Sequence, residues 1–260
     1  LPEEGQRELW STGADTVIAS ALNPRGHATP DVGGWRLTGE WPLVSGVDLA
    51  DWTLVCGLVP QKGRKVARFF AVPSRDYRVE DTWFNVGMRA TGSNTLVADG
   101  VFVPEHRSVA RGDVRCGRAV GSDAPCHTAG LRAISGTLFA APVLGAARSA
   151  VRAWSAMPAG KPAQESFAPR DNPLVRDVQA RAEGEIEGAA LLLRHVALTG
   201  DEGPDGGEGD PARPPRDCAL AADRLVDAVE RLFRSAGCRA QAQGHPLQRI
   251  WRDVHCAASH

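Results

Sequence analysis

The stretch GGWRLTGEWPLVSGVDLADW, residues 33–52, is the starting point for predicting the fold of this chain. Between Trp35 and Trp41, apolar or small residues alternate with Arg, Thr and Glu. This period of two residues predicts a β-strand with one apolar face. The glycine pair Gly33–Gly34 predicts the turn that leads into the strand, and Pro42 predicts the point where regular pairing ends.

Ser45 and Gly46 follow this strand and make its end a candidate ligand site. The pair places a small hydroxyl beside a residue that allows close approach to the backbone. A planar, partly polar ligand fits there, with Trp41 beside it and the Ser45 hydroxyl hydrogen-bonded to its edge. From the residues alone, an ordinary strand, bend and strand with a tryptophan core is an equal alternative.

A second patterned stretch, DTWFNVGMRATGSNTLVADGVFVPEHR, covers residues 81–107. Within it, the run from Arg89 to Asn94 places small hydroxyl-bearing residues behind one arginine. Such a run offers backbone N–H groups, hydroxyls and a cation to an anionic or hydrogen-bonding group. A plain β-turn is the alternative.

The rest of the first half of the chain predicts short strands. A buried strand at 16–22 is expected to end at the turn residues 23–26 (Asn-Pro-Arg-Gly). Further strands are predicted at 53–59, 67–72, 77–79, 83–88 and 95–103, with turns at 61–63 and 98–100. This spacing predicts a compact barrel or sandwich of roughly 100 residues.

Beyond residue 130 the apolar residues recur at steps of three and four, which predicts helices. We expect them at 134–157, with a kink at Pro142, at 173–198, at 217–236 and from 246 to the end. The acidic, Gly- and Pro-rich residues 200–216 are predicted to be disordered. The fold class is therefore α+β: an antiparallel β-barrel or sandwich at 1–109, a linker at 110–130 and a C-terminal α-helical bundle at 131–260.

Composition limits the class of protein. A formal net charge of -1 and 43% hydrophobic residues predict a globular protein that binds neither nucleic acid nor an anionic membrane. No apolar run approaches the roughly 18 to 20 residues of a membrane span, and no secretory signal is visible. The six scattered cysteines favour reduced thiols and a cytoplasmic location, with a Cys116–Cys126 disulfide as the alternative.

Together, residues 33–52 and 81–107 resemble the central β-domain of the acyl-CoA dehydrogenase fold. Within that fold the chain is most similar to the oxygenase components of two-component flavin-dependent monooxygenases, such as those that hydroxylate 4-hydroxyphenylacetate and aromatic polyketides. The resemblance covers most of the chain and begins partway into the family's usual length. It implies that the family's N-terminal helical domain has no counterpart in these residues.

The resemblance assigns roles to individual residues. It implies that Ser45 lies near the reactive edge of a flavin ring and that Ser20 offers a hydroxyl to the pyrimidine side. For the run after residue 88 it implies flavin or dimer contacts. The predicted cofactor-binding residues are Ser20, Trp41, Ser45, Gly46, Arg89, Thr91, Gly92 and Ser93.

The C-terminal run from Gln248 to His260 carries the second resemblance. In the monooxygenase group an Arg-Asp pair, here Arg252–Asp253, precedes by seven residues a histidine that faces the substrate. The matching His260 is the predicted catalytic residue together with Ser45, because a histidine that titrates near neutrality can hold or deprotonate a phenol. A frayed terminal histidine is the alternative. The spacing of His255, Cys256 and His260 fits no common zinc pattern, so no metal is expected.

These resemblances imply a monooxygenase that hydroxylates an aromatic substrate, with polyketides among the candidates, through a flavin C4a-hydroperoxide. The sequence has no Gly-x-Gly-x-x-Gly fingerprint for a dinucleotide, so reduced FMN or FAD is expected from a separate flavin reductase. A homo-oligomer, dimer or tetramer, is also implied. The short start leaves an alternative open, in which the chain is a cofactor-independent cyclase or dehydratase, or a partner subunit of another oxygenase.

Overall fold

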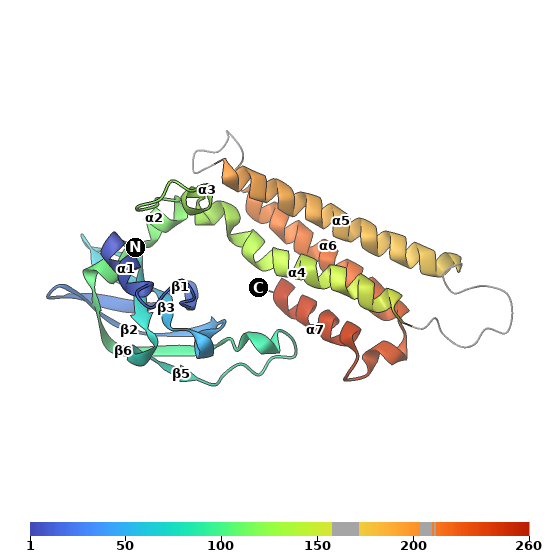
Figure 1. Cartoon of the computed structure of the whole chain (residues 1–260), viewed down its shortest axis with the longest axis horizontal. Coiled ribbons are helices and arrows are strands. Elements are labelled where there is room, and N and C mark those ends of the chain that lie inside the picture. The colour runs from blue at the N-terminus through green and yellow to red at the C-terminus, as the bar shows by residue number, and fades with distance from the viewer. Residues whose placement is uncertain (158–171, 203–209, 211, 260) are drawn as a thin grey trace. The chain divides into compact units, whose positions relative to one another are not determined.

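A computed structural model describes residues 1–157, 172–202, 210 and 212–259. The chain forms two compact units (Figure 1). The first contains Leu1–Asn85 and Arg89–Leu131, and the second contains Val86–Met88 and Arg132–His260. The seven strands lie in the first unit and the long helices in the second, so the predicted α+β class is confirmed.

A seven-stranded sheet dominates the first unit. Its strands lie in the order β5-β6-β2-β1-β3-β4-β7. β1 and β3 run parallel, and the other neighbouring strands run antiparallel. The elements of this unit are α1 (Glu3–Leu9), β1 (Ile18–Asp31), β2 (Gly34–Val44), β3 (Trp52–Gln61), β4 (Arg64–Pro73), β5 (Arg78–Glu80), β6 (Asn94–Pro104), β7 (Ser108–Ala110), α2 (Arg111–Arg115) and α3 (Pro125–Thr128).

Trp41 lies at the centre of the sheet's apolar core. Its side chain is 1% exposed, and its Nε1 donates a hydrogen bond of 2.7 Å to the carbonyl oxygen of Cys56. Two glycines make room for the indole: a Cβ at Gly26 would lie 2.2 Å from Trp41 Cζ2, and a Cβ at Gly39 would lie 2.8 Å from Cη2. Gly39 and Trp41, which belong to the alternating run that predicted this strand, therefore also form part of the core.

Two predicted turns are wrong, because the strands pass through them. β1 continues through residues 23–26, with a shift in its register against β3 between Ala21 and Gly26. β6 continues through residues 98–100, and Gly100 has a φ of 62°. Turn-forming residues also suit irregular positions inside long strands, where one chain has an extra residue relative to its partner.

The end of β2 differs from the prediction in a similar way. The strand does not end at Pro42 but continues to Val44. Its register against β6 shifts between Trp41 and Val44, where Leu43 has a positive φ of 62°. Pro42 therefore marks an irregularity in the pairing rather than its end.

Residues 83–88 form no strand, contrary to the prediction. The side-chain oxygen of Asn94 accepts hydrogen bonds from the backbone N–H groups of Thr82, at 2.9 Å, and Trp83, at 3.1 Å. A side chain therefore takes the place of a neighbouring strand at the start of this segment. The predicted linker at 110–130 likewise contains the short helices α2 and α3.

The second unit is a helical bundle of α4 (Leu131–Ser155), α5 (Pro173–Asp201), α6 (Arg213–Ser235) and α7 (Pro246–Ala258) (Figure 1). α4 continues through Pro142. The ends of the predicted disordered segment 200–216 are helical, since α5 ends at Asp201 and α6 begins at Arg213. Residues 203–209 and 211 lie outside the described residues.

Small side chains let the helices of the bundle approach one another closely. A Cβ at Gly136 of α4 would lie 2.7 Å from Cys218 Cβ of α6, and one at Gly200 of α5 would lie 2.5 Å from Ile134 Cγ2 of α4. The buried core of this unit contains many alanines: Ala140, Ala147, Ala150, Ala182, Ala189, Ala221, Ala228 and Ala240.

By length and composition α4 could cross a membrane, because an 18-residue window within it has a mean hydropathy of 1.3. The expectation that no stretch reaches this length is therefore wrong. Core helices of soluble proteins pass the same test. Val143 and Ala150 of α4 lie buried in the core of the bundle, so its apolar composition has a packing role.

Candidate functional site

Three hydroxyl groups form a hydrogen-bonded chain where β2 ends and β6 begins. Ser45 Oγ lies 2.8 Å from Ser93 Oγ, and Ser93 Oγ lies 2.7 Å from Thr91 Oγ1. The backbone N–H of Gly46 donates to the carbonyl oxygen of Thr91 at 2.8 Å. We call these four residues, with Gly92, the hydroxyl cluster. Ser93 is 4% exposed whereas Ser45 is exposed, so a buried hydroxyl supports one that faces outwards.

The backbone around the hydroxyl cluster is irregular. Gly46 and Gly92 have positive φ angles of 77° and 50°. Among the described residues, the non-glycine residues with positive φ are Leu43, Lys62 and Met88. Lys62 lies in the tight turn between β3 and β4, as the sequence predicted. The other two lie two residues before Ser45 and three residues before Thr91, at the approach to the cluster. Such strain gathers at functional sites, where the surrounding structure holds it in place.

Asp48 and Asn94 support the cluster. Sequence reasoning did not select Asp48, and it included Asn94 only as the last residue of the run 89–94, without a role of its own. Asn94 Nδ2 donates to Asp48 Oδ2 at 2.9 Å. A Cβ at Gly92 would lie 2.8 Å from the same carboxylate oxygen, so only glycine fits there without a shift. The signal was available at Asn94, because an amide directly after the Thr-Gly-Ser run can both donate and accept hydrogen bonds.

The structure thus brings together five of the eight predicted cofactor-binding residues: Ser45, Gly46, Thr91, Gly92 and Ser93. Arg89 is exposed at the start of the 3₁₀ turn Arg89–Thr91, next to the cluster in the chain. Ser20 is exposed on β1, and no hydrogen bond within the described part of the chain joins it to the cluster.

The structure does not add the two remaining predicted residues, Trp41 and His260, to this group. The indole of Trp41 is enclosed in the sheet core, so the described structure does not place it beside a ligand; this corrects the predicted position. The core alternative considered for this tryptophan fits the structure. His260, the predicted catalytic histidine, lies outside the described residues.

The hydroxyl cluster is suited to binding and orienting a ligand. Hydroxyl groups both donate and accept hydrogen bonds at neutral pH, and glycines let a flat ligand approach the backbone. An exposed hydroxyl held by a buried one fits the polar edge of a planar ring system such as a flavin. Among the described residues, no group of three or more His, Cys, Asp or Glu side chains could hold a metal ion.

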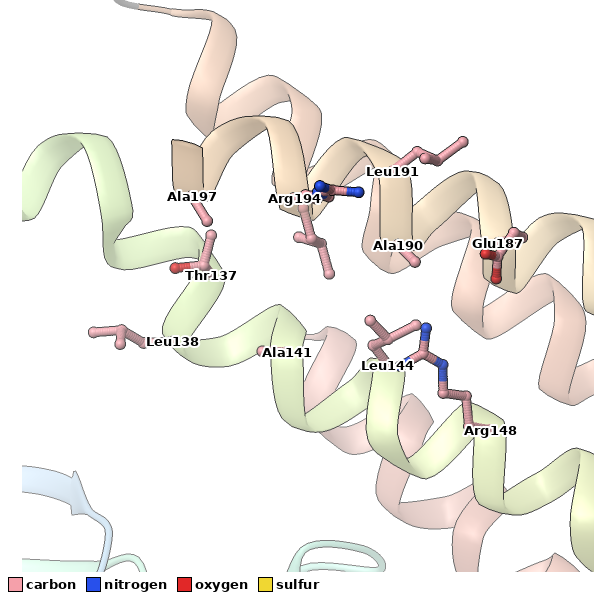
Figure 2. A pocket seen from close by; sticks show the side chains of 11 residues that line it. Thr137, Leu138, Ala141, Leu144, Arg148, Glu187, Ala190, Leu191, Arg194 and Ala197 are labelled. Atoms are coloured by element: carbon pink, nitrogen blue, oxygen red, sulfur yellow. The ribbon is translucent and has the colours of Figure 1, made fainter. Parts of the chain in front are cut away.

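An open groove of about 710 Å³ lies between α4 and α5 in the helical unit (Figure 2). Leu144 and Arg148 project from α4 towards α5. The other lining residues are Thr137, Leu138, Ala141, Glu187, Ala190, Leu191, Leu193, Arg194 and Ala197. This lining is mainly apolar and offers no cluster of hydroxyls and glycines, so the hydroxyl cluster remains the better flavin candidate.

Comparison with known proteins defines the class. Residues 137–260 match the family model of the acyl-CoA dehydrogenase C-terminal domain. The oxygenase subunit HsaA of a flavin-dependent monooxygenase from Rhodococcus jostii is 34% identical over 99% of this chain and 70% of its own length. The oxygenase component of an FADH₂-dependent resorcinol hydroxylase from a Rhizobium species is 31% identical over 100% of this chain and 68% of its own length.

A solved structure agrees. XiaF from a Streptomyces species, in complex with FADH₂ and glycerol, superposes with a TM-score of 0.86 at 29% identity, over 100% of this chain and 68% of XiaF. The chain belongs to the oxygenase subunits of two-component flavin-dependent monooxygenases, enzymes with the acyl-CoA dehydrogenase fold. These relatives support the predicted monooxygenase and not the cyclase, dehydratase or partner-subunit alternative.

Proposed function

We propose that this chain binds reduced flavin at the hydroxyl cluster and hydroxylates an aromatic substrate with dioxygen. The net reaction balances when reduced flavin, dioxygen and the arene give oxidised flavin, water and the phenol. Bound reduced flavin supplies the two electrons that activate dioxygen. The observation that carries the proposal is the chain of hydroxyls from Thr91 through Ser93 to Ser45, in a protein of this family.

Each residue of the cluster has a distinct part in the proposal. The exposed Ser45 hydroxyl bonds the polar edge of the flavin, and buried Ser93 fixes the direction of that hydroxyl. Thr91 in turn fixes Ser93. Arg89 offers a cation to the anionic part of the cofactor, and His260 binds the phenol.

Substrate, cofactor and partners are inferred from the relatives. Both the resorcinol hydroxylase and XiaF are named with FADH₂, so reduced FAD is the first cofactor to test and reduced FMN is the comparison. A monohydric or dihydric phenol is the first substrate class. A separate reductase supplies the reduced flavin, and the oxygenase works as a homo-oligomer. Exposed leucines on α4 and α5, among them Leu138, Leu191 and Leu198, support self-association.

Anaerobic titration with reduced FAD and reduced FMN tests the cofactor. We expect wild-type protein to bind, and Ser45→Ala and Ser93→Ala each to weaken binding about fivefold to tenfold, because one hydrogen bond is worth about 1 kcal/mol and 1.4 kcal/mol is tenfold in affinity. Ser11→Ala, at another exposed serine of the same unit, is the matched control and should bind like wild type.

Mixing the loaded protein with dioxygen and a phenol should then give the hydroxylated product, detected by mass spectrometry with ¹⁸O₂. Wild-type protein that binds neither reduced flavin would overturn the proposal. That result would favour the alternative function, a cofactor-independent cyclase or dehydratase.

A further inference from the structure

Residues 86–88 belong to the helical unit, although the residues before and after them belong to the strand-rich unit. Two hydrogen bonds attach them to α7. The backbone N–H of Met88 donates to Asp253 Oδ1 at 2.6 Å, and the guanidinium of Arg252 donates to the carbonyl oxygen of Val86. Arg252 is itself held by its Nε bond of 2.9 Å to Gln248 Oε1, one turn earlier on α7.

Gly87 lets this attachment form. Its position is buried, and a Cβ there would lie 2.2 Å from the carbonyl oxygen of Arg252 and 3.0 Å from the backbone nitrogen of Asp253. Those atoms are backbone atoms of a helix, so they cannot move aside as the end of a flexible side chain would. Residue 87 must therefore be glycine for the segment to lie against α7.

Met88 adopts a conformation that the attachment has to hold. Its φ is 53°, in the left-handed region, which is unfavourable for a non-glycine residue. A hydrogen bond from its N–H to a carboxylate is charge-assisted and strong enough to offset that cost. Asp253 therefore stabilises the backbone of Met88 directly.

We propose that Asp253 is a positioning residue: its hydrogen bond to the Met88 N–H holds residues 86–88 against α7, a contact that we call the latch. The latch fixes the start of the segment that carries Arg89, Thr91 and Ser93. Met88 is joined to Arg89 by a peptide bond, so the direction in which residue 89 leaves depends on the held conformation of Met88. The effect on flavin binding rests on the proposed function, whereas the latch itself does not.

The chemistry of the latch separates two variants. Asn keeps a side-chain oxygen that can accept from Met88, although it loses the charge, whereas Ala removes the acceptor. Without an acceptor the segment gains conformational freedom, and a ligand that needs it ordered must then order it on binding. Asp253→Asn should therefore resemble wild type, and Asp253→Ala should not.

Amide hydrogen exchange of the whole chain, read by mass spectrometry on peptides spanning residues 83–91, tests the latch without flavin. We expect exchange at Met88 to be at least tenfold faster in Asp253→Ala and changed less than threefold in Asp253→Asn. Gly87→Ala should give the same fast exchange, because its Cβ would push the segment away from the backbone of α7. Asp227→Ala, at an exposed aspartate of α6, is the matched control and should leave the exchange unchanged.

Titration of the same variants with reduced flavin tests the consequence. We expect binding about fivefold weaker in Asp253→Ala and close to wild type in Asp253→Asn. Unchanged Met88 exchange in Asp253→Ala, or equally fast exchange in both variants, would overturn the latch. Fast exchange with unchanged flavin affinity would overturn the positioning role. If wild type itself binds no flavin, the proposed function fails, and the exchange data still decide the latch.

Discussion

The two units of this protein achieve close packing in opposite ways. In the sheet unit one large indole, Trp41, lies over Gly26 and Gly39. In the helical unit many small side chains, largely alanines, let long regular helices approach one another. The sheet is irregular, with register shifts in β1 and β2, and the hydroxyl cluster lies beside one of them. Regular helices give stable packing, whereas irregular strands present backbone and hydroxyl groups to a ligand.

Removing the indole should have the largest effect on the sheet unit. We expect Trp41→Ala to lower the free energy of unfolding by about 3–5 kcal/mol, because it deletes a buried aromatic side chain and leaves a cavity between two glycines. Urea denaturation followed by circular dichroism measures the change. Trp10→Ala, at a tryptophan that is 46% exposed, is the control and should cost much less. Equal losses in both variants would mean that Trp41 is not the centre of the sheet core.

The second test enlarges a small residue in the bundle. Ala147 of α4 is fully buried, so Ala147→Leu should cost about 1–3 kcal/mol by forcing the helices apart. Ala141→Leu, on the exposed side of the same helix, should be close to neutral. Calorimetric melting of both variants gives the difference. A neutral Ala147→Leu would show that the alanine packing tolerates extra volume and would remove the contrast with the sheet.

The third and smallest effect concerns charge in the sheet unit. Hydrogen bonding to Arg107 holds the pKa of Glu8 at about 2, and His106 Nε2 lies 3.0 Å from the same carboxylate. Because the folded pKa is depressed below the ordinary value near 4.3, the stabilisation is fully present above that value and is lost as pH falls towards 2.

Glu8→Gln should therefore cost about 1 kcal/mol at pH 7, a figure reduced for solvent screening of a partly exposed pair. The gap from wild type should narrow between pH 5 and pH 2. Urea denaturation at several pH values measures it, with Glu3→Gln at an exposed position as the control. A gap that stays constant with pH would mean that the charge of Glu8 does not fasten α1 (Glu3–Leu9) to the sheet unit.

The sequence predicted much of this architecture, and its failures have a common cause. Alternation from Trp35 to Trp41 identified β2, and the helical period identified α4 to α7. Residues 23–26 and 98–100 were taken as turns, although Gly and Pro serve equally at irregular positions within strands. Residues 83–88 were predicted to be a strand because local pattern cannot reveal that Asn94 and Asp253 take their backbone hydrogen bonds.

The candidate site was predictable in the same uneven way. The resemblance selected Ser45, Thr91 and Ser93, which the structure joins by hydrogen bonds. It also selected Trp41, since an alternating pattern does not say whether an aromatic ring faces a ligand or a core. Asp253 was named only as part of the Arg-Asp pair that precedes His260, because its contact with Met88 spans 165 residues of chain.

Hydrogen exchange of the wild-type chain with and without saturating reduced FAD, under anaerobic conditions, shows where the flavin binds. If the hydroxyl cluster holds the flavin, peptides covering residues 43–48 and 89–95 should gain protection, while those covering 137–148 and 187–197, which line the groove between α4 and α5, should not change. Protection confined to the groove peptides, or none at 43–48 and 89–95 when flavin is bound, would mean that the hydroxyl cluster does not hold the flavin.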